Sequence, residues 1–136
     1  MTTTPKTFSY AVTLDREWTA ASTEGGTAIS LEEAWTPEHL VLAGLVRCTL
    51  TSLQFHARRA GLELLTSGEA EGVVARRESD GRFAFVEIAV AIDVTVDPAP
   101  AELRELLSKA ERDCFVGASL TAHPVTLWTV NGEEVR

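Results

Sequence analysis

The feature that most constrains the fold is a long alternation of apolar side chains in the middle of the chain. Every second residue from 84 to 96 is alanine, valine or isoleucine, and the residues between them are charged, polar and apolar in turn. A repeat of two with one apolar face predicts a long strand that covers a core on one side. The turn signal Asp80-Gly81 precedes it and residues 62–77 have the character of another strand, so we predict a hairpin.

A long helix is predicted to follow the motif Thr36-Pro37-Glu38 and to run to about Ala60. Threonine is a suitable N-cap, proline is favoured at the first helical position, and a glutamate is favourable near the positive end of the helix dipole. Residues 40–46 are apolar nearly all round, which is typical of a buried helix, and Gly61 is a natural stop.

Two short strands are predicted near the N-terminus. Residues 8–14 alternate between apolar and polar, a Glu-Gly-Gly turn signal follows at 24–26, and residues 27–31 are expected to return as a second strand. If the alternation continues, Arg16 points inward and needs a carboxylate partner such as Glu38. If the first strand ends at its last apolar residue, Arg16 lies on a loop instead.

The C-terminal part is predicted to hold a second helix and a closing strand. Apolar residues recur at helical spacing from Leu103 to Cys114, and Gly117 is expected to loosen or end this helix. Residues 125–130 form the closing strand, and Asn131-Gly132 starts a polar tail. Together these elements predict an α+β fold in a single domain of residues 1–136, with an antiparallel sheet packed on two main helices.

Charge and hydropathy exclude several classes of partner. The formal net charge is −8, whereas nucleic acids and anionic membranes attract a basic face. No run approaches about 18 consecutive apolar residues, so no membrane span is expected. The start of the chain is polar and no signal-peptide pattern follows it. We therefore expect a cytoplasmic protein without nucleic-acid or membrane partners.

Two cysteines are the candidates for chemistry. Cys48 lies within the long predicted helix in line with Leu45 and Ser52, and Cys114 lies on the apolar face of the second helix. A structural disulfide is not expected in a reducing compartment, and a buried cysteine is commonly a small core residue. If the two helices pack together, however, the thiols come within disulfide reach. Two inert core thiols and a redox pair are both open at this point.

No metal or phosphate site is predicted. His39, His56 and His123 lack the spacing of metal ligands, and the chain has neither a glycine-rich phosphate loop nor a C-x-x-C pair. We therefore expect no metal and no cofactor.

The segments around both cysteines resemble one protein family. The run that starts at Thr36-Pro37-Glu38 and reaches Cys48 is similar to the Thr/Asn-Pro-Glu helix that carries the first cysteine of the osmotically inducible (OsmC) and organic hydroperoxide resistance (Ohr) proteins. Residues 110–120, with Cys114 and Val116, resemble the segment that carries the second cysteine of that family. The resemblance covers about residues 8–130 and extends to the order of strands and helices.

The resemblance implies a thiol peroxidase that uses neither metal nor flavin. By it, Cys48 is the peroxidatic thiol, which attacks an organic hydroperoxide as thiolate and becomes a sulfenic acid. Cys114 then condenses with the sulfenic acid to form a disulfide, and a dithiol, such as a lipoyl-type one, restores both thiols. The resemblance also implies an intertwined homodimer with its sites at the subunit interface.

The family's active-site arginine, which lowers the pKa of the thiol, is the point where this chain departs from the pattern. Glu38 matches the glutamate that hydrogen-bonds this arginine. In the Ohr branch the arginine belongs to a Gly-Gly-Arg segment, but this chain has Gly25-Gly26-Thr27, so Arg16 is the remaining candidate. Phe115 also replaces the proline that commonly follows the second cysteine. The chain resembles a divergent OsmC-like branch, and a noncatalytic small-molecule-binding or stress-associated dimer is the alternative function.

Overall fold

The computed structural model describes residues 6–136 of the protein, in two compact units. The first unit ends at Thr36, and the second comprises Pro37–Arg136. The single domain of residues 1–136 that the sequence predicts stays a prediction. Both cysteines belong to the second unit.

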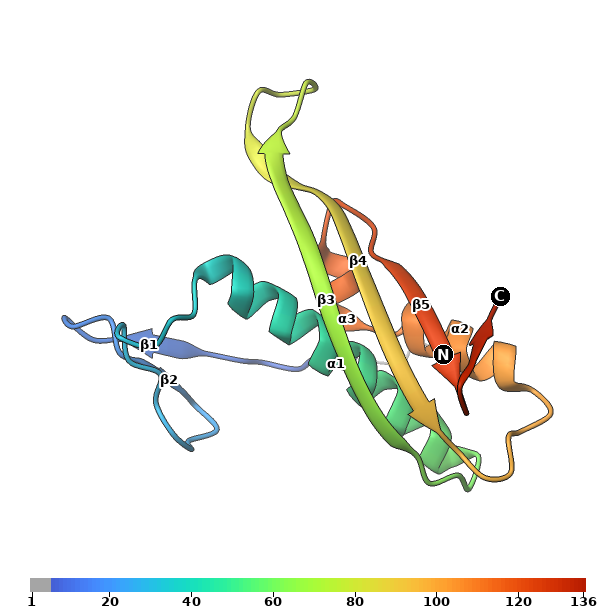
Figure 1. Ribbon diagram of the computed structural model, residues 1–136. Helices are drawn as coiled ribbons and strands as arrows, with labels where there is room; N and C mark the ends of the chain where they lie inside the picture. The colour runs from blue at the N-terminus through green and yellow to red at the C-terminus, as the bar shows by residue number, and fades with distance from the viewer. Residues whose placement is uncertain (1–5) are drawn as a thin grey trace, which may run out of the picture. The chain divides into compact units, whose positions relative to one another are not determined.

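The second unit is built on a four-stranded sheet with the order β3-β4-β5-β6 (Figure 1). Its strands are β3 (Leu65–Arg76), β4 (Phe83–Thr95), β5 (Val125–Val130) and β6 (Glu133–Val135). Strands β3 and β4 form the predicted long hairpin, with a bulge between Val73 and Val74. The turn between the strands contains Gly81, whose φ of +70° suits the glycine that the sequence places there.

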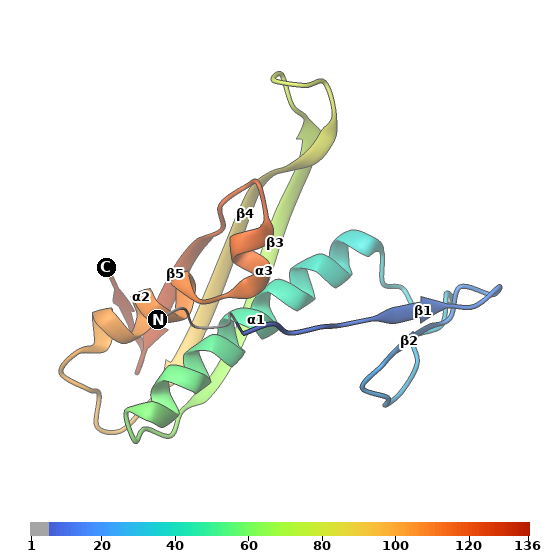
Figure 2. The ribbon, with the colours of Figure 1, turned by 180° about the vertical axis from the view of Figure 1, so that it is seen from behind.

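Three helices cover one face of this sheet, so the α+β class is confirmed (Figures 1 and 2). They are α1 (Pro37–Arg59), α2 (Leu103–Arg112) and α3 (Phe115–Ser119). The predicted apolar face of β4 is turned toward them, because its alternate residues Ile88, Val90, Ile92 and Val94 are buried, as is Val96 just beyond its end. The helix that the sequence predicts from Pro37 to about Ala60 is also confirmed, and Gly61 beyond its end has a φ of +73°.

The sheet is mixed, and the prediction that it is antiparallel throughout is wrong. Strands β3 and β4 pair antiparallel, as do β5 and β6, but β4 and β5 run parallel. In the chain, helices α2 and α3 lie between β4 and β5. They lead the backbone from the end of β4 back toward the end of the sheet where β4 starts, so that β5 can run in the same direction. Parallel neighbours need such a crossover, because a tight turn can join only antiparallel strands.

Helix α1 approaches the sheet closely at two glycines of β3. A Cβ added to Gly68 would lie 2.7 Å from Cδ1 of Ile92 and 3.0 Å from Cγ1 of Val46 in α1. A Cβ added to Gly72 would lie 3.2 Å from Cδ2 of Leu42, one helical turn earlier in α1. The absence of side chains at these positions therefore lets the first half of α1 pack directly on the hairpin.

The predicted polar tail is instead the last hairpin of the sheet. Asn131 and Gly132, with φ of +50° and +84°, form a tight turn that brings β6 back along β5. An Asn-Gly pair is the strongest short-range signal for such a turn, so the sequence contained the information. The side chain of Asn131 also accepts from the amide of Val96 at 3.0 Å and donates to its carbonyl at 2.7 Å.

The first unit holds a small two-stranded sheet of β1 (Val12–Leu14) and β2 (Ala20–Ser22). The first predicted strand is therefore shorter than expected. The return strand lies at Ala20–Ser22 and not at residues 27–31, which contribute only a bridge from Ile29 to Ala20. The turn at Asp15 is stabilised locally, since its carboxylate accepts from the amides of Glu17 and Thr19 at 2.9 and 3.0 Å.

Helix α1 is long and apolar enough, by length and composition, to cross a membrane, a test that core helices of soluble proteins also pass. Leu45, Leu53 and Ala57 of this helix are at most 1% exposed and belong to the core of the unit. Arg47 lies in the middle of the helix on its exposed side. We therefore interpret α1 as a core helix.

A charged contact holds the junction of α2 and α3 to α1. The Oδ2 atom of Asp113, the residue between α2 and Cys114, lies 2.7 Å from Nε2 of His56 in α1. Arg112 donates from Nε to the other oxygen of Asp113 at 2.9 Å. The hydrogen bonds from Arg112 and from His56 lower the pKa of Asp113 from 3.8 to about 2.

We predict that Asp113→Asn lowers the melting temperature at neutral pH, and that the difference from the wild type shrinks in acid. A carboxyl group whose pKa is depressed by folding stabilises the fold above its ordinary pKa, and this stabilisation is lost as the pH falls through the lower value. The difference should therefore disappear between the ordinary value of 3.8 and about 2. Thermal unfolding followed by circular dichroism from pH 7 to acid measures it. Asp93→Asn, on an exposed position of β4, is the control; a difference for Asp113→Asn that stays constant with pH contradicts the prediction.

Candidate functional site

Cys48 lies in the middle of α1, on the border between its buried and exposed sides. The side chains one turn before and after it, Leu45 and Ser52, are buried, as the predicted alignment requires, and Cys48 itself is half-buried. Arg47 is adjacent in sequence but exposed, because neighbouring helical residues point about 100° apart. The helix therefore presents the Cys48 side chain partly to the elements that pack beside it and partly to solvent.

Cys114 lies in the break between α2 and α3, and the prediction that it continues the second helix is wrong. Helix α2 ends at Arg112, and Cys114 has an extended backbone with φ of −77° and ψ of +108°. This conformation lets its sulfur accept from the amide of Gly117 at 3.4 Å, so Cys114 caps α3. The helical spacing of the sequence could not reveal the break, because Cys114 is buried in either arrangement.

The two thiols meet where α3 packs on α1. The sulfur of Cys48 accepts from the amide of Val116 at 3.4 Å, and the sulfur of Cys114 accepts from the next amide, that of Gly117, at the same distance. Cys114 is also near enough to raise the pKa of Cys48. Both are free thiols, so the structure describes the reduced form of the two cysteines.

Thr49 is a member of the site that the sequence analysis missed. Its side chain is 3% exposed, and its hydroxyl donates to the carbonyl of Leu45 at 2.9 Å. The same oxygen lies 3.5 Å from the sulfur of Cys114. A hydroxyl has one proton, so while it donates to the carbonyl it accepts from the thiol of Cys114. A threonine beside a helical cysteine is too common to signal this role in the sequence.

The surroundings of Cys48 raise its pKa above the ordinary value of 9.0. Burial is the main cause, because it disfavours the charged thiolate, and the amide of Val116 opposes this effect. The hydrogen bond and the charge of Cys114 raise the pKa further. Among the described residues, no cation contributes to this shift in the pKa of Cys48. The two sulfurs accept from neighbouring amides, an arrangement that suits a redox pair. The raised pKa, however, favours the protonated form of Cys48.

A cavity of about 470 Å³ adjoins Cys114. It lies between α1, the junction of α2 and α3, and the segment that leads into β5. Its walls contain hydroxyl, charged and apolar side chains, namely Leu45, Thr49, Glu111, Arg112, Cys114, Gly117, Ala118, His123, Pro124 and Thr126. Glu111 is held in place because its carboxylate accepts from the indole of Trp128 at 3.1 Å. A volume of this size is in the range of small-molecule sites.

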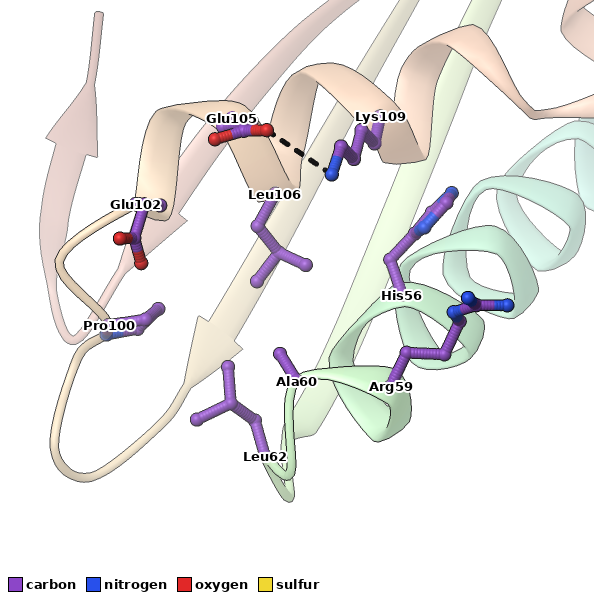
Figure 3. Close-up of a pocket in the computed structure, with 9 residues that line it drawn as sticks. All are labelled: His56, Arg59, Ala60, Leu62, Pro100, Glu102, Glu105, Leu106 and Lys109. Atoms are coloured by element: carbon purple, nitrogen blue, oxygen red, sulfur yellow. Dashed lines mark ion pairs between the residues drawn. The ribbon is translucent and has the colours of Figure 1, made fainter.

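A second cavity, of about 360 Å³, lies between the end of α1 and the start of α2 (Figure 3). His56 and Arg59 project into it from α1, opposite Leu106 and Lys109 of α2 (Figure 3). Lys109 is paired with Glu105 at 3.2 Å and His56 with Asp113, so these charges are balanced within the chain. This cavity contains no cysteine among the described residues that line it.

The other two predicted site residues, Glu38 and Arg16, are not brought to the thiols within the second unit. Glu38 lies in the first turn of α1, as expected, ten residues before Cys48 and therefore about 15 Å along the helix axis. Arg16 lies in the turn after β1, so the prediction that the strand continues and aims it inward is wrong, and the loop alternative is confirmed. Arg16 belongs to the first unit and Cys48 to the second.

Known proteins with the same fold share this arrangement of elements. An OsmC-like protein of unknown function from Vibrio cholerae is 16% identical, with a TM-score of 0.71, and the match covers 91% of this chain and 99% of that one. The organic hydroperoxide resistance protein OhrB of Bacillus subtilis is 22% identical, with a TM-score of 0.59 and coverages of 91% and 98%. One from Elizabethkingia anophelis is 20% identical, with a TM-score of 0.64 and coverages of 95% and 98%.

These identities establish a common fold and no more. No curated protein sequence matches the chain. The family model of OsmC-like proteins, however, matches residues 30–130, which include α1, both cysteines and the strands from β3 to β5. The resemblance noted in the sequence is thereby confirmed, and the chain belongs to the OsmC-like protein family.

Proposed function

We propose that the protein is a cysteine-based peroxidase that reduces organic hydroperoxides, with Cys48 as the peroxidatic and Cys114 as the resolving thiol. The observation that carries the proposal is the pairing of the two thiols. They come from different elements, and their sulfurs accept from the consecutive amides of Val116 and Gly117 at 3.4 Å. Cysteines that form a disulfide must lie on elements that pack together, and the bond from the Val116 amide to the Cys48 sulfur shows that α3 packs on α1 at this place.

The proposed reaction has three steps. The thiolate of Cys48 attacks the distal oxygen of the hydroperoxide, the O–O bond breaks, and the alkoxide takes a proton and leaves as an alcohol. Cys114 then attacks the sulfur of the sulfenic acid, and water leaves as the disulfide forms. A dithiol finally reduces the disulfide by exchange and becomes a disulfide itself. The amide of Val116 stabilises the Cys48 thiolate, because a backbone N–H donor favours the charged form.

Several proteins of the same fold support the substrate class through their names. Those from Bacillus subtilis, Elizabethkingia anophelis and Legionella pneumophila are named organic hydroperoxide resistance proteins. Their identities to this chain are 22%, 20% and 20%, which establish the shared fold. That this chain acts on the same class of substrate is part of our proposal. A neutral, partly apolar peroxide also suits a sulfur that lies between apolar helices.

We propose that Arg16 activates Cys48 by lowering the pKa of its thiol, and that Glu38 positions this arginine. The reason is chemical, because burial keeps the Cys48 thiol protonated and a cation is the group that reverses this effect. In the family that the sequence resembles, an arginine held by a glutamate has this task. Arg16 is the candidate that the sequence offers, and Glu38 is the matching glutamate.

We further expect the protein to act in the cytoplasm as a homodimer. The second unit exposes several large apolar side chains, and contiguous exposed apolar surfaces commonly mark interfaces. They include Val74 of β3, Phe83 of β4 and Leu127 of β5, which are 44%, 74% and 46% exposed. The same surfaces fit the intertwined homodimer that the family resemblance implies.

One observation favours a second candidate function, that of a noncatalytic small-molecule-binding dimer. The pKa of Cys48 is raised, and none of the groups that shift it is a cation. A thiol that stays protonated reacts slowly with peroxide, since the thiolate is the nucleophile. The two functions differ in the fate of Cys48 when it meets one equivalent of peroxide.

We predict that the protein consumes cumene hydroperoxide in the presence of dithiothreitol and that Cys48→Ser abolishes this activity. Cys114→Ser should still form one sulfenic acid per chain, which dimedone traps, but no intramolecular disulfide. Intact mass spectrometry after one equivalent of peroxide distinguishes these products. If Cys48 of the wild type remains a thiol and no reductant supports turnover, the peroxidase proposal is wrong and the binding function takes its place.

We predict that Arg16→Ala slows the oxidation of Cys48 at pH 7 by about tenfold or more, because one unit of pKa changes the thiolate fraction tenfold. The wild-type rate should level off near neutral pH, and the rate of the variant should keep rising toward the raised pKa of the buried thiol. Stopped-flow measurement of sulfenic acid formation from pH 6 to 10 records both profiles. Arg47→Ala is the control, since Arg47 adjoins Cys48 in sequence but is exposed. Equal profiles for Arg16→Ala and the wild type would remove Arg16 from the site.

We predict that Thr49→Val slows disulfide closure but not the first oxidation step. When Cys114 ionises to attack the sulfenic acid, the Thr49 hydroxyl can turn from the Leu45 carbonyl and donate to the thiolate. A hydrogen bond to a charged group contributes about 1.5–3 kcal/mol, which is about tenfold or more in rate. Quenched-flow trapping of the sulfenic acid gives the closure rate, and Thr49→Ser should restore it.

Thr51→Val is a matched control for this prediction. Thr51 lies two residues further along α1 and makes the same type of bond, from its hydroxyl to the carbonyl of Arg47 at 2.7 Å, but it is exposed and does not touch a cysteine. Closure at the same rate in Thr49→Val and Thr51→Val would show that the hydroxyl has no part in the step.

A further inference from the structure

We propose that the cavity between the end of α1 and the start of α2 binds a dipolar aliphatic molecule, which carries a carboxylate at one end and an ammonium group at the other. The cavity has a volume of about 360 Å³, and neither cysteine is among the described residues that line it. The site is therefore separate from the two thiols, and its ligand does not depend on the proposed function.

The floor of the cavity is apolar. Ala60 and Leu62, which follow α1, contribute to it together with Pro100 before α2 and Leu106 within α2 (Figure 3). Leu106 is 9% exposed and belongs to the hydrophobic core, so core packing holds this part of the floor in place. None of these four side chains carries a hydrogen-bonding group. The floor thus suits an aliphatic chain better than a peptide, whose amides would lose their hydrogen bonds to water there.

Charged side chains surround the floor, and three of the five titratable ones in the lining already have a partner of opposite charge. Nζ of Lys109 lies 3.2 Å from a carboxylate oxygen of Glu105, one turn earlier on the same helix. Nε2 of His56 lies 2.7 Å from Asp113, which is outside the described lining. These contacts leave one cation and one anion of the lining for a ligand.

The two remaining charges are Arg59 and Glu102. No ion pair within the part of the chain that the structure describes includes either of them. Arg59 comes from the end of α1 and Glu102 from the start of α2, on opposite sides of the floor (Figure 3). The guanidinium carbon of Arg59 lies 5.6 Å from the centre of the Phe55 ring, a cation–π contact that restricts the side chain without using a carboxylate.

Charge complementarity selects the class of ligand. A carboxylate can bind the guanidinium of Arg59 through two parallel hydrogen bonds, and an ammonium group can pair with the carboxylate of Glu102. An aliphatic chain between these two groups covers the apolar floor and removes it from water. A fatty acid or an aliphatic amine supplies only one of the two partners, so it should bind more weakly than a molecule with both.

The first test compares matched probes with the wild-type protein. 6-Aminohexanoate and 8-aminooctanoate carry both charges, and hexanoate, hexylamine, octanoate and octylamine carry one charge on chains of the same lengths. Titrations of nitrogen-15-labelled protein, followed by heteronuclear NMR, should shift the amide signals of residues 56–62 and 100–109. At one chain length at least, the dipolar probe should bind about threefold or more tightly than either analogue, as expected for one exposed ion pair.

Three results overturn the proposal. They are no binding of either dipolar probe, an analogue that binds as tightly as the dipolar probe at both chain lengths, and amide shifts confined to another part of the protein.

The second test removes one charge at a time. Arg59→Gln should lower the affinity for the dipolar probe to that of the amine, and Glu102→Gln should lower it to that of the carboxylic acid. Both side chains are exposed, so the variants should fold, which circular dichroism verifies. Arg58→Gln and Glu133→Gln are the controls, because both residues are exposed and lie outside the described lining. Full affinity in Arg59→Gln or Glu102→Gln, or an equal loss in the controls, contradicts the proposal.

A third measurement separates this site from the peroxidase proposal. Cys48→Ser should bind the dipolar probe as tightly as the wild type, since Cys48 is outside the described lining. Binding by a wild-type protein that does not consume hydroperoxide would leave this site intact and refute only the proposed function. Loss of binding in Cys48→Ser would contradict a site that is separate from the thiols.

Discussion

The packing of α1 on the β3–β4 hairpin is the constraint on which the rest of the second unit depends. The hairpin offers an apolar face on β4 and two glycines on β3, and α1 fills the space with Leu45 and Leu53, which are at most 1% exposed. Because residues on a helix keep a fixed angular relation, burying these side chains also determines where Cys48 points. The position of the first thiol is thus a consequence of core packing.

The position of the second thiol depends on the non-helical junction between α2 and α3, where Cys114 lies. Three contacts hold the junction of α2 and α3 in place: Asp113 with His56, Glu111 with Trp128, and Cys114 with Thr49. Each joins the junction to a different part of the core, on α1 or β5. The junction therefore brings Cys114, Val116 and Gly117 against α1 together, and the two sulfurs receive consecutive amides.

Geometry and electrostatics act in opposite directions at this site. The sulfurs of Cys48 and Cys114 accept from neighbouring amides, as suits the proposed pair, yet burial raises the pKa of Cys48 and favours its protonated form. A site with only these residues is stable in the reduced form and slow to react. No cation is among the described groups that shift the pKa of Cys48. For this reason the proposed function assigns activation to Arg16, which lies outside the second unit.

The sequence by itself determined the α+β class, the long hairpin, α1 with its stop at Gly61, and the family, because each depends on local periodicity, turn residues or motifs read within a short window. It also contained the Asn131-Gly132 turn to β6, which local turn rules predict. Only the tertiary structure decided that β5 runs parallel to β4, that α2 ends before Cys114, and that Thr49 and the cavity adjoin the second sulfur. The physical reason is that these features arise from contacts between residues far apart in the chain, and such contacts leave no periodic trace in the residues that make them.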